Sequence, residues 1–285
     1  MTKHVGLIGY PVKHSVSAAF QQAAFDHYKL DIRYQPWETK PSKLEAALER
    51  LYEPDAVGAN VTVPHKEAVI PLLDRVEPPA DQIGAVNTII KARNKLVGYN
   101  TDAHGFMRAL RGDAGFDPSG KQGVVLGAGG AARAVAFVLL KAGATHLTII
   151  NRTLERVESL SIELTANLDE WQSIAALAWE ERSFRQALND CDLLVNCTTI
   201  GMKHSKSEGQ SPVDAKFLTK NILVCDLVYN PLETPLLKMA AAAGANTLGG
   251  LPMLIYQGAA AFELWTACQA PVEVMFEAAR GALEV

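Results

Sequence analysis

The chain of 285 residues is 48% hydrophobic and 20% charged, with a formal net charge of −4 and a pI near 6.0. This balance is typical of a globular protein, and the length suits one large domain or two modest ones. The slight acidity argues against a basic nucleic-acid footprint or a polybasic membrane patch. Apolar runs are too short for a membrane span, and the amino-terminal residues lack the apolar core of a signal peptide. We therefore expect a cytoplasmic protein with no nucleic-acid or membrane partner.

The cysteines show neither CxxC spacing nor histidines at zinc-site intervals. They are Cys191, Cys197, Cys225 and Cys268. A core of this size needs no disulfide or metal to be stable. We expect reduced, mostly buried thiols in a cytosolic protein, and no metal site.

The first hundred residues alternate strand-like and helix-like segments. Strands are predicted over 4–10, 31–37 and 56–63, helices over 15–28 and 41–51, and a hairpin over 85–91 and 95–100. A helix over 103–110 leads into residues 112–123, whose glycines, proline and aspartates indicate a linker. The alternation predicts an α/β layer with a largely parallel sheet.

A second strand–turn–helix unit begins after this linker. Gly127-Ala128-Gly129-Gly130-Ala131-Ala132 fits G-x-G-x-x-A, follows the apolar run at Val124 and opens a helix that ends near Gly143. Gly127 permits the tight turn, Gly129 lets a pyrophosphate approach the backbone, and the helix amino terminus faces the phosphates. A bare match is weak and could be a turn without a ligand, but this context favours dinucleotide binding. Later apolar runs predict strands buried on both faces, over 146–152, 193–199 and 222–229.

The end of the next strand bears on the choice of cofactor. An NAD site usually has an acidic residue there, whereas this chain has Asn151-Arg152-Thr153 with Arg156 one turn later. A guanidinium binds phosphate through paired charge-assisted bonds, so the arginines favour the 2′-phosphate of NADP. Alternatively, Thr153 is a helix cap and Arg156 a solvated side chain, and Glu155 weakens the positive site.

Polar clusters at strand ends of the first domain indicate a substrate site. Ser15 and Ser17, with the helix N–H groups beside them, form a candidate carboxylate cradle, although Ser15 could simply cap the helix. His14 is close enough to be a minor contact.

A second polar cluster surrounds the end of the third predicted strand. Asn60 and Thr62 point to one face of an extended strand, and Lys66 follows Pro64, which stops it. With Asn87 and Asp102, these groups suit a polyhydroxylated anion, and Lys66 and Asp102 could manage the proton of an alcohol oxidised by hydride transfer. Read singly, each is a surface residue or turn former. The rival base is His65, but neighbouring residues of an extended segment point opposite ways.

Nine ordered blocks, spread over nearly the whole chain, resemble shikimate dehydrogenases. They are GLIGYPVKHSVS, NVTVPHK, GAVNT, GYNTD, GAGGAARA, NRTLER, NCTTIGM, DLVYNPLETPLL and GGLPMLIYQ. The resemblance implies two α/β domains: a substrate-binding and catalytic domain over 1–104, completed by helices over 251–285, and a Rossmann-like doubly wound NADP-binding domain over 105–250. The implied activity is reversible, NADPH-dependent reduction of 3-dehydroshikimate to shikimate in aromatic amino-acid biosynthesis, by a monomer or homodimer.

The resemblance also implies roles for individual residues. Lys66 matches the catalytic lysine with Asp102 beside it, and Ser15 and Ser17 match the carboxylate binders. The expected ligands of the ring hydroxyls are Asn60, Thr62, Asn87, Asp102 and Gln257, with Tyr229 near the substrate. The expected NADP contacts are Gly127, Ala128, Gly129, Gly130, Ala131, Asn151, Arg152, Thr153 and Arg156, with Met202, Leu227 and Gly250 lining the nicotinamide pocket.

Two departures from the family pattern lie beside this site. Ala18 stands where many relatives have proline, and Ala103 where many have glycine. Three alternatives stay open: a quinate/shikimate dehydrogenase preferring NAD, a folate-linked dehydrogenase of similar architecture, and a ligand-sensing module without turnover. The serine pair and Asp102 argue against the folate-linked enzyme, and Lys66 with the dinucleotide turn argues against the sensing module.

Overall fold

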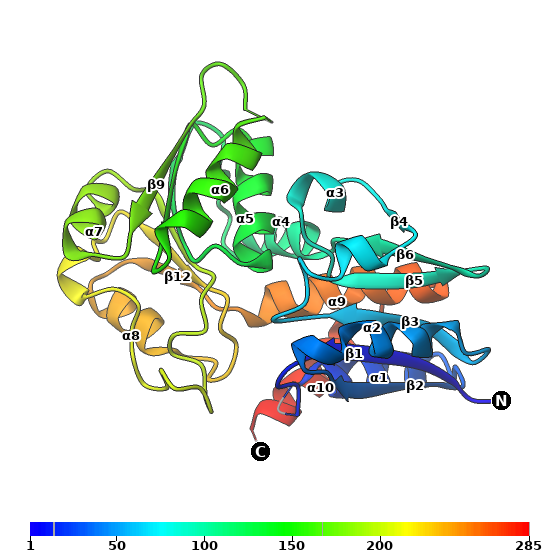
Figure 1. The fold of residues 1–285 in the computed structure, drawn as a ribbon. Coiled ribbons are helices and arrows are strands. Elements are labelled where there is room, and N and C mark those ends of the chain that lie inside the picture. Colours follow the sequence, from blue (N-terminus) through cyan, green and yellow to red (C-terminus); the bar gives the residue numbers. More distant parts are fainter. Residues whose placement is uncertain (14, 167, 285) are drawn as a thin grey trace. The chain divides into compact units, whose positions relative to one another are not determined.

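Figure 1 shows the fold in a computed structural model, which describes residues 1–13, 15–166 and 168–284. The chain divides into two compact units, each with its own sheet. Unit 1 comprises Met1–Gly105 and Ile255–Val285, and unit 2 comprises Phe106–Leu254. The chain passes between the units within two helices, α4 (Asp102–Gly112) and α9 (Leu251–Thr266).

The sheet of unit 1 has six strands in the order β2-β1-β3-β5-β6-β4. The strands are β1 Lys3–Gly9, β2 Ile32–Glu38, β3 Ala56–Val61, β4 Arg75–Val76, β5 Thr88–Ala92 and β6 Lys95–Tyr99. Parallel pairing joins β2, β1 and β3, whereas β5 is antiparallel to both β3 and β6. The predicted hairpin is therefore confirmed. Because β4 is also parallel to β6, three of the five strand pairs are parallel, and the sheet is mixed because the tight hairpin makes its two strands antiparallel.

Short helices connect these strands. They are α1 Ser17–His27, α2 Leu44–Glu49 and α3 Ala80–Ile83, with 3-10 turns at Pro41–Lys43, Arg50–Tyr52 and Ile70–Leu72. The single helix predicted over 41–51 is thus an α-helix of 6 residues between two 3-10 turns. The strand predicted to reach residue 63 ends at Val61, where the chain turns and the His65 N–H bonds to the Thr62 carbonyl.

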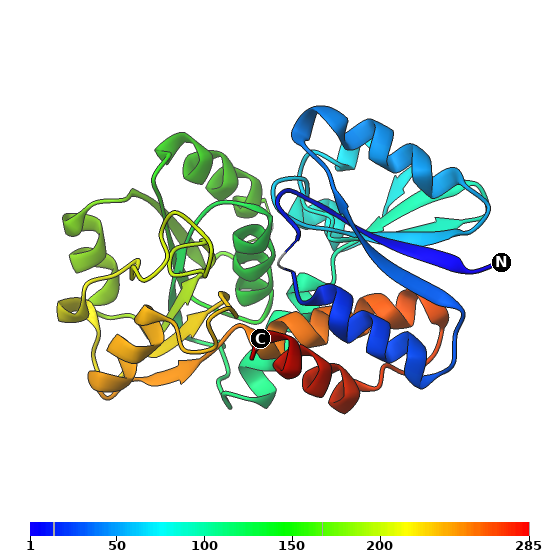
Figure 2. The same cartoon turned by 90° about the horizontal axis from the view of Figure 1, so that it is seen from below.

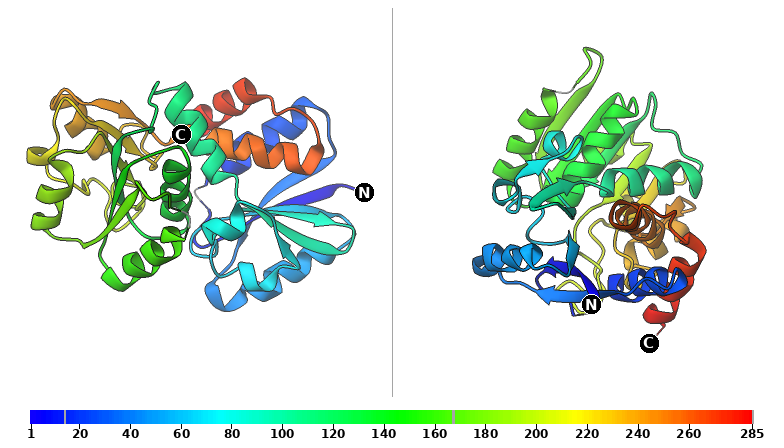
Figure 3. Two further views of the ribbon diagram at one scale, coloured as in Figure 1. Left: turned by 90° about the horizontal axis from the view of Figure 1, so that it is seen from above. Right: turned by 90° about the vertical axis from the view of Figure 1, so that its right-hand side faces the viewer.

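Helices cover both faces of this sheet. Figures 2 and 3 show α1, α9 and α10 (Val272–Leu283) together on one face, with α2 on the other. On the first face the rings of Phe25 and Phe262 lie 5.3 Å apart. A Cβ at Gly258 would lie 2.5 Å from the Phe20 ring, so α9 approaches α1 closely. The carboxy-terminal helices therefore pack against the amino-terminal part of the chain within unit 1.

The sheet of unit 2 has six parallel strands in the order β12-β11-β10-β7-β8-β9. The strands are β7 Gln122–Leu126, β8 His146–Asn151, β9 Ser173–Ala178, β10 Leu193–Asn196, β11 Leu223–Asp226 and β12 Asn246–Leu248. The strand order reverses between β7 and β10. In a doubly wound sheet, the crevice at the carboxyl ends of two such strands is where a ligand binds. The predicted Rossmann-like architecture is confirmed.

Four helices accompany this sheet, α5 and α6 on one face and α7 and α8 on the other (Figure 1). They are α5 Gly130–Lys141, α6 Leu154–Thr165, α7 Glu181–Leu188 and α8 Pro235–Ala242, with a 3-10 turn at Ala215–Phe217. The second face is closed by apolar side chains such as Phe184, Leu188 and Leu236 packed on Val124 and Leu194. The linker predicted over 112–123 is shorter than expected, because α4 includes Gly112 and β7 begins at Gln122.

The described residues also bear on membranes and thiols. In the parts of the chain that the structure describes, no helix is both long and apolar enough to span a bilayer. Cys225 is buried, whereas Cys191, Cys197 and Cys268 are half-buried. The expectation of mostly buried thiols thus holds fully for Cys225, and the other three thiols are only partly exposed.

Candidate active site

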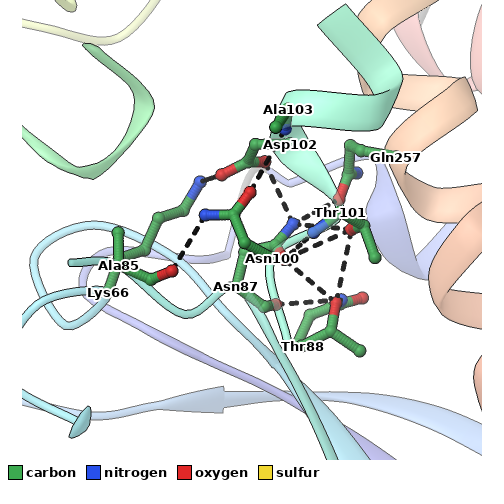
Figure 4. Close-up of polar contacts among 10 residues, drawn as sticks. Lys66, Ala85, Asn87, Thr88, Asn100, Thr101, Asp102, Ala103 and Gln257 are labelled. Atoms are coloured by element: carbon green, nitrogen blue, oxygen red, sulfur yellow. Dashed lines mark hydrogen bonds and ion pairs between the residues drawn. The ribbon is translucent and has the colours of Figure 1, made fainter. Parts of the chain in front are cut away.

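Lys66 and Asp102 form an ion pair in unit 1 (Figure 4). Lys66 lies in the turn after β3, and Asp102 is the first residue of α4. The Lys66 Nζ donates to Asp102 Oδ2 over 2.6 Å, and the side chains are 14% and 5% exposed. A short charge-assisted bond with little water around it holds both groups in one geometry. The two predicted catalytic residues are therefore in direct contact.

Asn87 organises the groups around this pair (Figure 4). Its Nδ2 lies 3.0 Å from Asp102 Oδ1, 3.1 Å from Gln257 Oε1 and 2.8 Å from Thr101 Oγ1. Its Oδ1 accepts from the Thr101 N–H at 2.7 Å, which fixes the orientation of the amide. The structure thus brings Asn87, Asp102 and Gln257 together, although Gln257 comes from the distant helix α9.

Asn100 and Thr101 support the site and were not predicted. Asn100 Nδ2 donates to the Ala85 carbonyl at 2.9 Å, and its Oδ1 accepts from the Ala103 N–H at 3.2 Å. Both residues are almost fully buried, at 8% and 4% exposed. Two adjacent polar residues directly before Asp102 in GYNTD were the available signal, because buried polar side chains need partners.

Asn60 is buried behind Asn87 and makes its bonds inside the protein. Its Oδ1 accepts from the Tyr34 hydroxyl at 2.7 Å, and its Nδ2 lies 3.1 Å from both the Asn87 carbonyl and Thr88 Oγ1. Asn60 therefore supports the Asn87 backbone in this structure. Thr62 is half-buried beyond the end of β3, where a Cβ at Gly9 would lie 2.3 Å from its methyl group.

The serine pair follows β1 at the same edge of the sheet. Because β1 and β3 are parallel neighbours, the segments after both strands meet at their carboxyl ends. Ser15 is half-buried and Ser17 is buried, and the Ser17 N–H donates to Ser15 Oγ at 3.3 Å. The N-cap position of α1 is Val16, without a side-chain cap bond, so capping by Ser15 is marginal. His14 lies outside the described residues.

His65 has a different partner from Lys66. It is 1% exposed, and its Nε2 lies 2.7 Å from the Thr39 carbonyl oxygen, which requires a proton on that nitrogen. The His65 ring thereby ties the turn before Lys66 to the end of β2. This geometry favours a supporting role for His65 over a role as the base.

The glycine-rich turn of unit 2 leaves room for a phosphate group. Gly127 has φ +108°, a left-handed conformation that favours glycine, and its N–H donates to the Ile150 carbonyl at 2.8 Å. A Cβ at Gly129 would meet no atom within 4 Å, and the backbone enters α5 at Gly130. Open space beside free helix N–H groups fits a dinucleotide pyrophosphate. Ala128 is buried and Ala131 half-buried within the same segment.

The predicted 2′-phosphate site lies at the end of β8. Arg152, Thr153 and Arg156 are exposed, and Arg156 Nη2 lies 3.3 Å from the Ala128 carbonyl. The structure therefore brings Arg156 to the glycine-rich turn. Asn151 Nδ2 donates to the Thr153 carbonyl at 2.9 Å. Thr153 occupies the N-cap position of α6 without a side-chain cap bond, so the alternative explanation that it caps this helix loses support.

Leu227, Gly250 and Met202 lie in the segments that follow β11, β12 and β10. A Cβ at Gly250 would lie 2.4 Å from the Leu227 carbonyl oxygen, so these two backbones touch. Met202 is half-buried in a turn in which its N–H bonds to the Thr199 carbonyl at 3.2 Å. Tyr229 is half-buried between β11 and α8 and belongs to unit 2, unlike the other predicted substrate residues.

A doubly wound sheet with a glycine-rich turn at its switch point is the architecture of dinucleotide-dependent dehydrogenases. Matches to family models show which family of dehydrogenases the chain resembles. The model described as shikimate dehydrogenase substrate binding domain matches residues 7–89, that of shikimate / quinate 5-dehydrogenase matches 113–224, and that of the shikimate 5′-dehydrogenase C-terminal domain matches 250–280. The chain belongs to the shikimate dehydrogenase family.

Known shikimate dehydrogenases are similar to this chain over nearly its full length. A shikimate dehydrogenase (NADP(+)) from Methanopyrus kandleri is 47% identical over 277 residues, covering 97% of this chain and 94% of the relative. A crystal structure of a shikimate dehydrogenase with NADP+ has a TM-score of 0.89 at 39% identity, covering 99% and 96% of the two chains. The Thermus thermophilus enzyme, solved with NADP(H) and shikimate, has a TM-score of 0.84 at 38% identity, covering 99% and 100%.

Proposed function

We propose that this chain is an oxidoreductase that interconverts 3-dehydroshikimate and shikimate with NADP(H), a step of aromatic amino-acid biosynthesis. Unit 1 would bind the substrate and unit 2 the cofactor. The observation that carries this proposal is the 2.6 Å bond between Lys66 and Asp102, set among the amides of Asn87 and Gln257. Such a cluster suits a polyhydroxylated substrate whose oxygen gains or loses a proton.

Each predicted substrate residue has a proposed role. Ser15 and Ser17 would bind the carboxylate, since they follow β1, whose carboxyl end lies beside that of β3. Asn87, Asp102 and Gln257 would bond ring hydroxyls directly, and Thr62 completes that edge. Asn60 would act mainly by holding Asn87, because its amide bonds lie inside the protein. Tyr229 would contact the substrate.

Lys66 would handle the proton. In the reducing direction its ammonium group donates a proton to the substrate carbonyl oxygen, which becomes the hydroxyl of shikimate, and solvent then reprotonates the amine. Asp102 accepts from Lys66 and bonds the same hydroxyl, so it holds both atoms in line. Bound NADPH would supply the hydride to the carbonyl carbon. In oxidation Lys66, as the neutral amine, takes the hydroxyl proton.

The residues of unit 2 fit NADP. Open space at Gly129 and the start of α5 would receive the pyrophosphate, and Arg152 and Arg156 the 2′-phosphate. The proposed contacts otherwise follow the glycine-rich turn, the end of β8 and the loops after β10, β11 and β12. They are Gly127, Ala128, Gly130, Ala131, Asn151, Thr153, Met202, Leu227 and Gly250.

The second candidate is a dehydrogenase that also oxidises quinate and prefers NAD. It is favoured by the family model matching residues 113–224, whose description includes both substrates. Exposed arginines where NAD sites carry an acid weigh against it. We further propose a cytoplasmic location, where the four thiols would stay reduced, and a monomer or homodimer.

An assay of purified protein with shikimate and quinate, each paired with NADP+ and with NAD+, tests this proposal through the absorbance of the reduced cofactor. We expect turnover with shikimate and NADP+ to exceed every other pairing. Comparable turnover with quinate or NAD+ would select the second candidate. A folded protein without turnover in any pairing would reject both.

A further inference from the structure

Asp226 ends β11 with a carboxylate that is 0% exposed and joins three segments of unit 2. Its Oδ1 accepts from Asn196 Nδ2 at 2.8 Å and from the Val228 N–H at 3.1 Å. Its Oδ2 accepts from the Thr234 hydroxyl at 2.6 Å. These partners belong to the end of β10, the segment after β11 and the N-cap of α8. One buried carboxylate thus connects the loops at the carboxyl edge of the sheet.

Asn196 connects Asp226 to the glycine-rich turn. Its Oδ1 accepts from Thr198 N–H at 3.1 Å and from Thr198 Oγ1 at 2.7 Å. The methyl group of Thr198 lies 3.3 Å from where a Cβ of Gly127 would be. Asp226 therefore orients the Asn196 amide, and this amide holds Thr198 against the glycine-rich turn. The contact lies where the strand order reverses, between β7 and β10.

A second branch leads to the residues proposed for the nicotinamide side. The Asn196 carbonyl accepts from the Leu227 N–H at 3.0 Å. The Leu227 carbonyl in turn contacts the backbone of Gly250, where a Cβ would lie 2.4 Å away. Asn196, which Asp226 bonds, therefore holds the segment after β11, and that segment contacts the one after β12.

Three hydrogen-bond donors converge on the Asp226 side chain. Thr234 Oγ1 accepts from the Leu237 N–H at 3.2 Å and donates its own hydrogen to Asp226. Asp226 therefore accepts from three donors, and an amide would place an N–H₂ group against one of them. Burial raises the pKa of Asp226 to about 6, so retaining this group costs free energy that an apolar residue would not cost.

We propose that Asp226 is a positioning residue for NADP, acting through Asn196 and Thr198 on the glycine-rich turn and through Asn196 and Leu227 on the nicotinamide side. This inference rests on the proposed binding of NADP to unit 2. Asp226 itself would touch neither cofactor nor substrate. The rival explanation is that the carboxylate only stabilises the fold of unit 2.

The test compares Asp226→Asn with a matched control, Gln172→Ala. Gln172 is also buried, at 9% exposed, and its Nε2 donates to the Leu140 and Ala144 carbonyls at 2.8 Å each. It precedes β9, so it lies at the opposite edge of the same sheet. Either substitution disturbs buried bonds, but the control does so far from the proposed cofactor site.

Calorimetric titration gives the Kd of NADP+, and thermal unfolding without ligand gives Tm. We expect both variants to lower Tm, but only Asp226→Asn to raise the Kd, by about tenfold. Thr198→Val keeps the shape and the backbone bond to Asn196 but loses the hydroxyl, which donates to Asn196 Oδ1 and accepts from the Ile200 N–H, and it should also raise the Kd. This second variant keeps the test decisive if Asp226→Asn does not fold.

The other possible results contradict either the positioning role of Asp226 or the proposed function. If wild-type protein binds NADP+ and both Asp226→Asn and Thr198→Val bind equally well, the positioning role is wrong while the proposed function stands. If Gln172→Ala weakens binding as much as Asp226→Asn, the role of Asp226 is stability alone. If wild-type protein binds no NADP+, the proposed function fails and this inference fails with it.

Discussion

Lys66 Nζ and Asp102 Oδ2 lie 2.6 Å apart, although 36 positions separate the two residues in the chain. The turn after β3 presents one residue and the first turn of α4 the other. Asn87, which lies between β3 and α4 in the sequence, bonds Asp102 from the side. The ion pair is thus a product of the mixed sheet, in which β5 returns antiparallel beside β3.

Replacing Lys66 by alanine should lower kcat by about 10³-fold, because the group that moves the hydroxyl proton is removed. Steady-state rates with shikimate and NADP+ measure the effect. Lys95→Ala is a matched control, since Lys95 is an exposed lysine of the same unit at the β5–β6 hairpin. Near-normal turnover of Lys66→Ala would remove Lys66 from the mechanism.

Asp102→Asn should lower kcat by about 10²-fold and also lower Tm. An asparagine has one acceptor oxygen in place of two, so Lys66 and Asn87 can no longer both donate to it. The lysine charge, 14% exposed, would also lose its counter-ion, which costs about 3 kcal/mol in buried pairs. Rates and thermal unfolding together separate the two effects, and unchanged rates and substrate affinity would contradict the assigned role.

The sequence predicted which residues gather at the site better than it predicted which of them bond inside the protein. Lys66, Asn87 and Asp102 could be placed together because each follows or precedes a strand at one sheet edge. The internal bonding of Asn60 could not be predicted, because its partner Tyr34 lies on β2 and reaches it only through packing. Gln257 was found by resemblance alone, since its approach to Asn87 depends on α9 packing against Phe20.

In unit 2, the sequence likewise predicted some strands and missed others. The strands β7, β8, β10 and β11 are buried apolar runs and were predicted. The edge strand β9 carries a short apolar run over 174–178 in which three of the five residues are alanine, and alanine is depleted in strands, so this run does not mark a strand. The strand β12 has 3 residues, too few for a periodic signal. Neither edge strand was predicted.

Arg156→Ala should raise the KM for NADP+ by about tenfold and leave that for NAD+ nearly unchanged, since only NADP+ carries the 2′-phosphate. Its guanidinium already reaches the Ala128 carbonyl at 3.3 Å, beside the proposed pyrophosphate position. Arg182→Ala, at an exposed position of α7 on the other face of the sheet, provides the control. Equal changes with the two cofactors would refute a 2′-phosphate contact.

His65→Gln should keep kcat within about tenfold of the wild-type value, with an unchanged pH profile, because we assign proton transfer to Lys66 and a supporting role to His65. A glutamine amide can still donate to the Thr39 carbonyl, which the ring meets at 2.7 Å. His65→Ala leaves that buried carbonyl without its donor and should lower stability by about 2 kcal/mol. Loss of one limb of the pH–rate profile in His65→Gln would instead assign His65 to proton transfer.

Asp226→Asn should change how stability depends on pH. Burial raises the pKa of Asp226 from 3.8 to about 6, so the folded protein binds this proton more tightly than the unfolded chain. The stabilisation from this proton is complete below pH 3.8 and is lost as pH rises through 6. Burial also raises the pKa of the neighbouring Cys225 thiol, which stays neutral over this range.

Wild-type protein should therefore gain about 1.4 kcal/mol relative to Asp226→Asn when the pH falls from about 7 to about 5. Other groups titrate equally in both proteins and cancel in the comparison. Denaturant unfolding of the two proteins at both pH values gives the four free energies required. A difference between them that does not change with pH would show that the carboxylate is ionised at both values, and that Asn196, Val228 and Thr234 stabilise its charge fully despite burial.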